Sequence, residues 1–215
     1  MLFRSYRFEA ALPGFRTYVQ TGITLQVGAN TVISPVLEVG QVSDQVEVQA
    51  DAALVETRST GIGQMIDNQR AVELPLNGRQ ANELILLSGV ANLGGGSGVN
   101  RANSVYSATA ISVAGGVSTG LYYSLDGGAH NDPYNNFNLP LPFPDALQEF
   151  KVETSGLQAQ YGTHSSGAVN AVTKSGTNDF HGSLFEFVRN GSMNARNAFA
   201  VTNDGLKRNQ FGGTA

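Results

Sequence analysis

The apolar residues of this chain occur in short alternating runs that are separated by turn-forming residues. Tyr6, Phe8 and Ala10 alternate with polar residues before a Pro-Gly turn, and a second alternating run over 23–27 stops at Gly28. Alternation with a period of two is typical of half-buried strands, and clusters of Gly, Pro and Asn mark the turns between them. No apolar run approaches the roughly 18 residues that a membrane-spanning helix needs. The chain is therefore expected to be rich in short strands.

The composition agrees with a folded, turn-rich chain. Hydrophobic residues make up 41% of the 215 residues, which is enough for a core and argues against wholesale disorder. Charged residues make up only 14%, below the ~25% of ordinary soluble domains, whereas 26 residues are glycine. The net charge of −4 and the lack of a basic patch give no reason to expect a nucleic-acid partner. The absence of cysteine excludes disulfides and cysteine-ligated zinc.

Two zones differ in their pattern. Residues 1–50 contain about four short alternating segments, including one over 32–39, and resemble the second half of a β-sandwich. Residues 51–175 mix strands with short helices, which predicts an α+β domain. There we expect a helical turn capped by Asn68, a helix over 81–88 that buries Leu84 and Ile85 and ends at Gly89, and a short helix from 144 through 149. Strands are predicted within 55–66 and over 108–114, 121–125, 150–154 and 167–173.

A third kind of strand is predicted at residues 180–190. Its eleven residues match the ~9–11 residues of a tilted transmembrane β-strand. The alternation is imperfect because Phe185, Phe187 and Val188 do not share one face, so spacing alone favours an ordinary soluble strand. We expect this segment to be extended, poorly anchored and projecting from the preceding domain, with an unpaired strand edge that promotes aggregation.

Motifs for catalysis are weak throughout the chain. The glycine run at 93–98 has no following Lys-Ser or Lys-Thr and is better explained as a loop than as a phosphate cradle. Residues 162–167 have the wrong spacing for a nucleophile elbow. Asp126, His130 and Asp132 lie within seven residues and are possible ligands of a metal ion, although turns at 126–127 and 131–133 explain the acidic residues equally well. No constellation for hydrolysis, phosphoryl transfer or redox chemistry is present, and no cofactor is expected.

The loop residues Tyr134, Asn135 and Asn136 combine an aromatic ring with amides. This combination suits the binding of polar ligands, and packing of the loop against another part of the protein explains it equally well. Together with Asp126 and Asp132, these three residues are the candidate ligand contacts.

Several segments resemble one family, the TonB-dependent outer-membrane receptors, and specifically their Oar-like branch. Residues 122–136 (YYSLDGGAHNDPYNN) and 144–154 (PDALQEFKVET) are similar to segments of the family's plug domain. Residues 161–174 resemble the strand that closes the plug, and 175–190 (SGTNDFHGSLFEFVRN) resemble the linker and first barrel strand. The LPLNGR segment at 74–79 is also similar. Five motifs in family order over roughly 115 residues make the resemblance specific.

The resemblance implies a domain organisation. Segments 11–15, 22–28 and 37–40 are similar to the carboxypeptidase-regulatory-like sandwich that precedes the plug, a module without peptidase activity in such proteins. Residues 1–50 would then be a partial all-β sandwich, 51–175 the α+β plug, and 176–215 the linker and first strand or strands of a transmembrane β-barrel whose remainder is not present. The chain is accordingly expected to be an interior fragment.

The resemblance also implies a function and partners. The expected function is to gate energy-coupled passage of a ligand through an outer-membrane barrel, without enzymatic activity. The partners would be the receptor's own barrel, a TonB-type energy-coupling protein and an unknown transported ligand. Many plugs carry Arg-Gly-Pro after the strand that here ends near Thr154, and this chain does not, so contacts made through that arginine cannot be carried over. The alternative is a soluble, non-enzymatic adhesion or carbohydrate-binding module.

Overall fold

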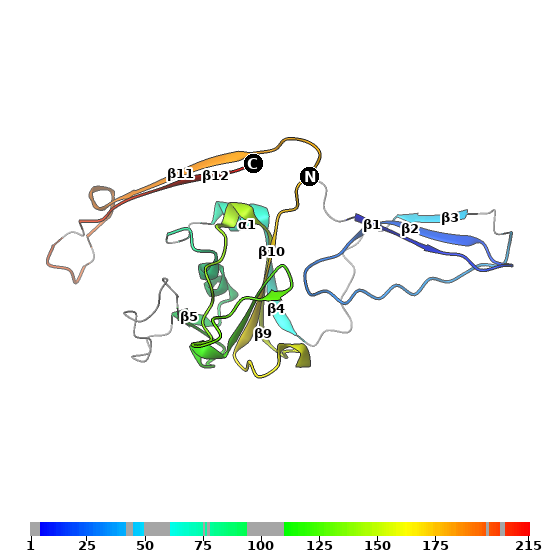
Figure 1. Ribbon diagram of the computed structural model, residues 1–215, viewed down its shortest axis with the longest axis horizontal. Helices are drawn as coiled ribbons and strands as arrows, with labels where there is room; N and C mark the ends of the chain where they lie inside the picture. The colour runs from blue at the N-terminus through cyan, green and yellow to red at the C-terminus, as the bar shows by residue number, and fades with distance from the viewer. Residues whose placement is uncertain are drawn as a thin grey trace.

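The strands that the structure describes form four separate sheets, with few helices. The structure is a computed structural model, and it describes residues 5–41, 45–49, 61–74, 76, 78–93, 110–196, 198–202 and 205–215. Among these residues the sheets contain three, five, two and two strands, and none closes into a barrel. Figure 1 shows the three-stranded sheet on one side of the α+β unit and a long two-stranded ribbon along another edge of that unit.

The N-terminal sheet has the order β1-β2-β3. β1 (Ser5–Ala10) is antiparallel to β2 (Thr17–Thr24), and β2 is parallel to β3 (Gln45–Gln49). Val19 and Ile23 of β2 are its buried hydrophobic residues. The strand predicted over 32–39 is wrong: within the described ranges this segment makes a single bridge, Phe15 with Val39. Alternation alone does not make a strand, because the backbone also needs a neighbouring strand to bond to. The described residues thus form one sheet of the predicted sandwich.

The five-stranded sheet has the order β4-β9-β10-β7-β8 and forms the centre of the α+β unit. β10 (Gly167–Thr173) is antiparallel to β9 (Leu147–Ser155) and parallel to β7 (Leu121–Leu125). β4 (Ile62–Asp67) pairs with the other edge of β9, and the short β8 (Gly128–Ala129) forms a hairpin with β7. The predicted strand over 167–173 is confirmed, as is that over 121–125.

One face of this sheet carries the core. Along β10, Val169 and Ala171 point to this face, and their register partners Val152 and Phe150 on β9 are equally buried. Leu84 and Ile85, both 0% exposed, cover the face from the 3-10 helix η1 (Ala81–Ser88), and a two-stranded sheet of β5 (Ala91–Leu93) and β6 (Ile111–Val113) packs beside it. The predicted burial of Leu84 and Ile85 is confirmed. Gly89 ends this helix in the left-handed conformation (φ 75°), as predicted.

Two expectations about the helices are wrong in detail. The helix α1 (Asn68–Glu73) is capped by Asp67 and not by Asn68: the Asp67 carboxylate accepts the N–H of Arg70 at 2.8 Å. Asn68 instead donates to the carbonyl of Leu147 at 2.7 Å and so joins α1 to β9. The helix predicted from 144 through 149 is only the turn η3 (Pro144–Ala146), because β9 begins at Leu147 and pairs with β10. The remaining 3-10 turns are η2 (Ser118–Gly120), η4 (Ala159–Tyr161) and η5 (Gly191–Met193).

The C-terminal ribbon is a hairpin of β11 (Ser183–Asn190) and β12 (Lys207–Thr214). Its eight residue pairs run from Ser183 with Thr214 to Asn190 with Lys207. The predicted extended conformation of 180–190 is thus confirmed for 183–190. The predicted poor anchoring is wrong, because this segment pairs with β12 and the ring of Phe185 also contacts the ring of Phe143 in the α+β unit. A sequence of one strand does not show that a second strand returns beside it.

Burial of Tyr123 predicts a loss of stability at alkaline pH. This ring is 2% exposed in the core, and burial raises its pKa well above the ordinary value. A group whose pKa is raised by folding contributes stability that is fully present below the unfolded pKa, about 10 for tyrosine, and that is lost as the pH rises toward the folded pKa. Above pH ~10 we therefore expect the free energy of unfolding to fall by up to about 1.4 kcal/mol per pH unit from this group.

The measurement is urea unfolding between pH 8 and pH 11. Tyr123→Phe should flatten the alkaline decline, whereas Tyr134→Phe is the matched control because Tyr134 is 91% exposed. An equal slope in both variants would contradict the assignment to Tyr123.

Candidate functional site

Asp132 organises the loop that contains four of the five candidate ligand contacts. Its carboxylate accepts the N–H of Tyr134 at 2.9 Å and the side-chain amide of Asn135 at 3.3 Å. Its backbone N–H donates to the carbonyl of Phe137 at 2.7 Å, and its carbonyl accepts the N–H of Asn136 at 2.8 Å. An aspartate that bonds the backbone two residues later is typical of a turn. Asp132 is therefore occupied in shaping the loop.

Asn136 joins this loop to the sheet. It has a left-handed backbone (φ 57°), which asparagine tolerates better than most residues. Its side-chain amide donates to the carbonyl of Thr119, and its amide oxygen lies 3.2 Å from Nε2 of His164. The His164 ring in turn packs edge-on against Tyr122, with ring centroids 5.1 Å apart. The loop is thus held at both ends, and it presents Tyr134 and Asn135 to solvent.

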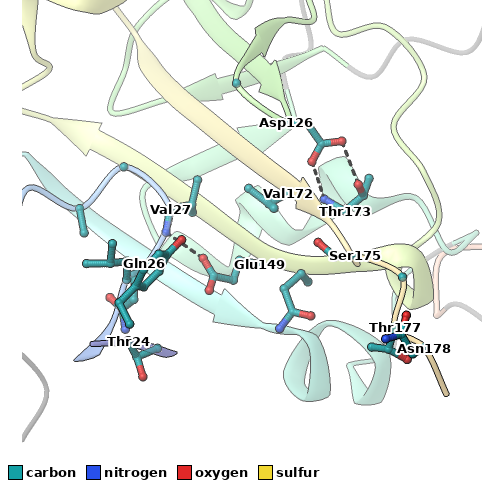
Figure 2. Close-up of a pocket in the computed structure, with 17 residues that line it drawn as sticks. Thr24, Gln26, Val27, Asp126, Glu149, Val172, Thr173, Ser175, Thr177 and Asn178 are labelled. Atoms are coloured by element: carbon teal, nitrogen blue, oxygen red, sulfur yellow. Dashed lines mark hydrogen bonds between the residues drawn. The ribbon is translucent and has the colours of Figure 1, made fainter. Parts of the chain in front are cut away.

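Asp126 lies at the opposite end of β7 from this loop. Its two carboxylate oxygens accept the backbone N–H and the hydroxyl of Thr173, both at 2.8 Å, as Figure 2 shows. Its own N–H donates to the carbonyl of Ala171 at 2.9 Å. Asp126 therefore attaches the β7–β8 turn to the end of β10. The structure brings Asp132, Tyr134, Asn135 and Asn136 together and separates Asp126 from them.

Asp126 lines a cavity of about 790 Å³ between the N-terminal sheet and the α+β unit. Its walls come from the end of β2 and the segment after it, the β7–β8 turn, the start of β9, and the end of β10 and the segment after it (Figure 2). Across it, the carboxylate of Glu149 accepts the backbone N–H of Val27 at 2.8 Å. The lining residues include two carboxylates and no lysine or arginine, so the cavity does not suit an anionic ligand.

The second face of the five-stranded sheet carries a polar network that the sequence analysis did not identify. Ser124 donates to the amide oxygen of Asn170 at 2.6 Å, and the Asn170 amide donates to the hydroxyl of Tyr161 at 3.1 Å. Glu153 is 1% exposed and lies 3.0 Å from Nζ of Lys151, but its oxygens make no well-aimed hydrogen bond among the described residues. Burial raises the pKa of Tyr161, and the negative charge of Glu153 adds to the rise. Only the alternation of Lys151 and Glu153 with the apolar residues of β9 signals this face in the sequence.

A buried ion pair is the second feature that the sequence analysis missed. Arg79 and Asp145 pair at the base of the C-terminal hairpin, with side chains only 5% and 7% exposed. They are 66 residues apart in the sequence, and neither stands in a motif that indicates a partner. The one signal is that both residues lie in segments that carry the family resemblance, Arg79 at the end of LPLNGR and Asp145 within 144–154.

Two negative findings concern the part of the chain that the structure describes. No helix there is long and apolar enough to cross a membrane. No three His, Cys, Asp or Glu side chains within the described ranges gather in a way that would hold a metal ion. His130, the third residue of the metal alternative, has its Nε2 3.1 Å from the carbonyl of Pro140.

Comparisons with known proteins give two matches. A family profile described as "Outer membrane beta barrel domain" matches residues 172–215, which include the end of β10 and the whole hairpin. A "TonB-dependent transporter Oar" of Myxococcus xanthus is 26% identical over 180 residues, which cover 80% of this chain. The chain spans 16% of the length of that relative.

These matches agree with the mostly β architecture and assign the C-terminal hairpin to the class of outer-membrane barrel domains. The chain is similar to TonB-dependent receptors, and both matches support an outer-membrane location. The family resemblance seen in the sequence is confirmed.

The bonds of Asp126 predict that it stabilises the sheet. Asp126→Ala removes both bonds to Thr173 and leaves alanine in a left-handed conformation (φ 51°). We expect the free energy of unfolding to fall by about 1–2 kcal/mol, because the bonds are partly exposed to water. Asp126→Asn keeps an acceptor oxygen and tolerates the left-handed backbone, so its loss should be smaller. Urea midpoints measure both variants, and an unchanged midpoint for Asp126→Ala would contradict this role.

Proposed function

We propose that this chain is the plug-containing part of a TonB-dependent receptor that gates energy-coupled passage of a ligand through a β-barrel. In this proposal residues 51–175 are the plug, residues 1–50 belong to a carboxypeptidase-regulatory-like sandwich, and residues 176–215 are the linker and the first barrel strands. The protein is not an enzyme and needs no cofactor. Its partners are the receptor's own barrel, a TonB-type energy-coupling protein and an unidentified transported ligand.

The observation that carries this proposal is the continuity between the α+β unit and the hairpin. β10 is the central strand of the sheet, and the outer-membrane barrel profile begins at Val172, just before β10 ends. The hairpin then returns to the unit, where Phe185 contacts Phe143. A plug domain inside a barrel has this relation to the first barrel strands, because it is covalently joined to the wall that surrounds it.

The two faces of the hairpin support the same proposal. Leu184, Val188 and Phe211 lie on one face and are 92%, 57% and 79% exposed. Phe185 and Phe187 lie on the other face, which meets the α+β unit. Barrel strands alternate between apolar residues that face lipid and residues that face the lumen. The exposed face carries these three apolar side chains beside Glu186 and Asn209, and the opposite face meets the unit that we propose as the plug.

The physical need for a plug arises from the size of such barrels. A barrel of about 22 strands leaves a lumen that its own side chains do not fill. A folded domain inside the lumen closes this opening, and it must shift or partly unfold when cargo passes.

The proposal predicts a conductance change in a receptor that joins this chain to a complete barrel. Deletion of residues 51–175 should convert closed receptors into open channels in planar lipid bilayers, because the lumen is then unfilled. Deletion of residues 5–49 is the matched control and should leave the conductance closed. A closed barrel after removal of 51–175 would contradict the plug assignment.

One observation favours the second candidate, a soluble carbohydrate-binding or adhesion module. Tyr134 is 91% exposed on a loop that is firmly bonded at both ends, and an exposed aromatic ring beside an amide suits a sugar. A one-sided platform, however, does not enclose a ligand, whereas good pockets bury ~70–90% of the ligand surface.

Calorimetry with this chain distinguishes the two candidates. Titration with iron-siderophore complexes, cobalamin and oligosaccharides should show nothing stronger than about millimolar binding, because a platform without the barrel gives few contacts to offset the cost of association. Micromolar binding that is lost in Tyr134→Ala and kept in Tyr6→Ala would favour the soluble module.

A further inference from the structure

We propose that Arg79 is a latch between the α+β unit and the β11–β12 hairpin, and that undocking of the hairpin and opening of the Arg79–Asp145 ion pair are a single event. The latch is a contact within this chain, and the geometry of that contact supports it. Its consequence for transport rests on the proposed function.

Arg79 is positioned by a turn with unusual backbone geometry. Gly78 and Arg79 are both left-handed, with φ of 82° and 54°. Such a conformation is uncommon for arginine and persists only where the surroundings hold it. Here Nη1 donates to the carbonyl of Val72 at 3.0 Å, and Nη2 pairs with the carboxylate of Asp145. The side chain is thereby fixed with its guanidinium edge toward the α+β unit.

Two aromatic rings of the hairpin lie close to the same guanidinium. The ring centroid of Phe187 lies 4.3 Å from Cζ of Arg79, and that of Phe185 lies 5.3 Å away. Phe143 of the α+β unit packs on Phe185 with centroids 5.4 Å apart. On β12, Gln210 donates to the carbonyl of Gly78 at 2.7 Å, so both strands contact the turn that carries Arg79.

This arrangement depends on a property that arginine has and lysine lacks. A guanidinium is planar, and it can donate hydrogen bonds in its plane while aromatic rings stack on its face. The attraction between the cation and the rings increases as water is removed from the site. Arg79 and Asp145 are both buried, with side chains 5% and 7% exposed.

The ion pair and the hairpin therefore depend on one another. A two-stranded hairpin is marginally stable by itself and gains stability by packing on another surface. If the hairpin leaves, water reaches Arg79 and Asp145, and an ion pair exposed to water contributes little. If Arg79 moves, the rings lose the cation beneath them. Under the proposed function, a displacement of the plug at Arg79 would release the first barrel strands from it.

The test uses tryptophan fluorescence in the full 215-residue chain, which contains no tryptophan. Phe187→Trp places the probe over Arg79, and Phe211→Trp places the control probe on the opposite face of the hairpin, where Phe211 is 79% exposed. Acrylamide quenching is measured for each probe with Arg79 and with Arg79→Lys. The lysine keeps the charge opposite Asp145 but removes the planar face.

With Arg79 present, the quenching constant at position 187 should be lower than that at 211. Arg79→Lys should raise it by about twofold or more at 187 and leave it unchanged at 211, because the stacking surface is lost. Equal quenching at the two positions with Arg79, or no rise at 187 with lysine, would overturn the proposal.

A second measurement tests the same contact with substitutions in the hairpin, so that the test still works if Arg79→Lys unfolds the α+β unit. The double variant Phe185→Leu with Phe187→Leu should speed amide hydrogen exchange in 70–80 and leave exchange in β9 and β10 unchanged. The matched control, Leu184→Ser with Phe211→Ser, alters the outer face of the hairpin. It should leave hydrogen exchange unchanged both in 70–80 and in β9 and β10. Unchanged exchange in 70–80 for the Phe variant would overturn the proposal. Neither measurement involves conductance, so a failure here is distinct from a failure of the plug assignment.

Discussion

The pairing of β10 with β9 on one side and β7 on the other is the interaction on which the rest of the structure depends. This one strand bonds antiparallel to β9 and parallel to β7, and it thereby aligns the rows of side chains on both faces of the sheet. In one row Val169 lies beside Val152 and Tyr123, and all three are buried in the core. A shift of the register by one residue would exchange the two faces and bury the polar row in the core.

The second face shows why such a shift would be costly. Asn170 lies between Ser124 and Lys151 and bonds to Ser124 and to the hydroxyl of Tyr161. Glu153 is buried close to the same tyrosine, with Lys151 as its counter-charge. Buried polar groups stabilise a fold only where their partners are in place, and their removal from those partners is strongly unfavourable. The polar face therefore favours one register over its alternatives.

The end of β10 is the point where the chain passes from the sheet to the hairpin. Asp126 bonds Thr173 at this point, and the chain then leaves the sheet and enters the segment that resembles outer-membrane barrels. The hairpin returns to cover Arg79 and Asp145, while its opposite face carries exposed apolar residues. One side of the hairpin thus contacts Arg79 through aromatic rings, and the other side exposes Leu184, Val188 and Phe211 beside Glu186. Under the proposed function, these two sides of the hairpin would face the plug and the membrane.

The sequence by itself determined the local elements whose signals are contained in a few neighbouring residues. The strand at 167–173, the buried pair Leu84 and Ile85 and the cap at Gly89 are predicted by periodicity and by the conformational freedom of glycine. The family resemblance came from ordered motifs and was confirmed. The tertiary structure alone decided what depends on distant partners. Among the described residues, the alternating segment at 32–39 has a single bridge, Phe15 with Val39, and no ladder. β11 is anchored by β12, and Asp126 is separated from the Asp132 loop. Arg79 and Asp145 meet across 66 residues, because an ion pair depends on distance in space, which the order of residues along a chain does not specify.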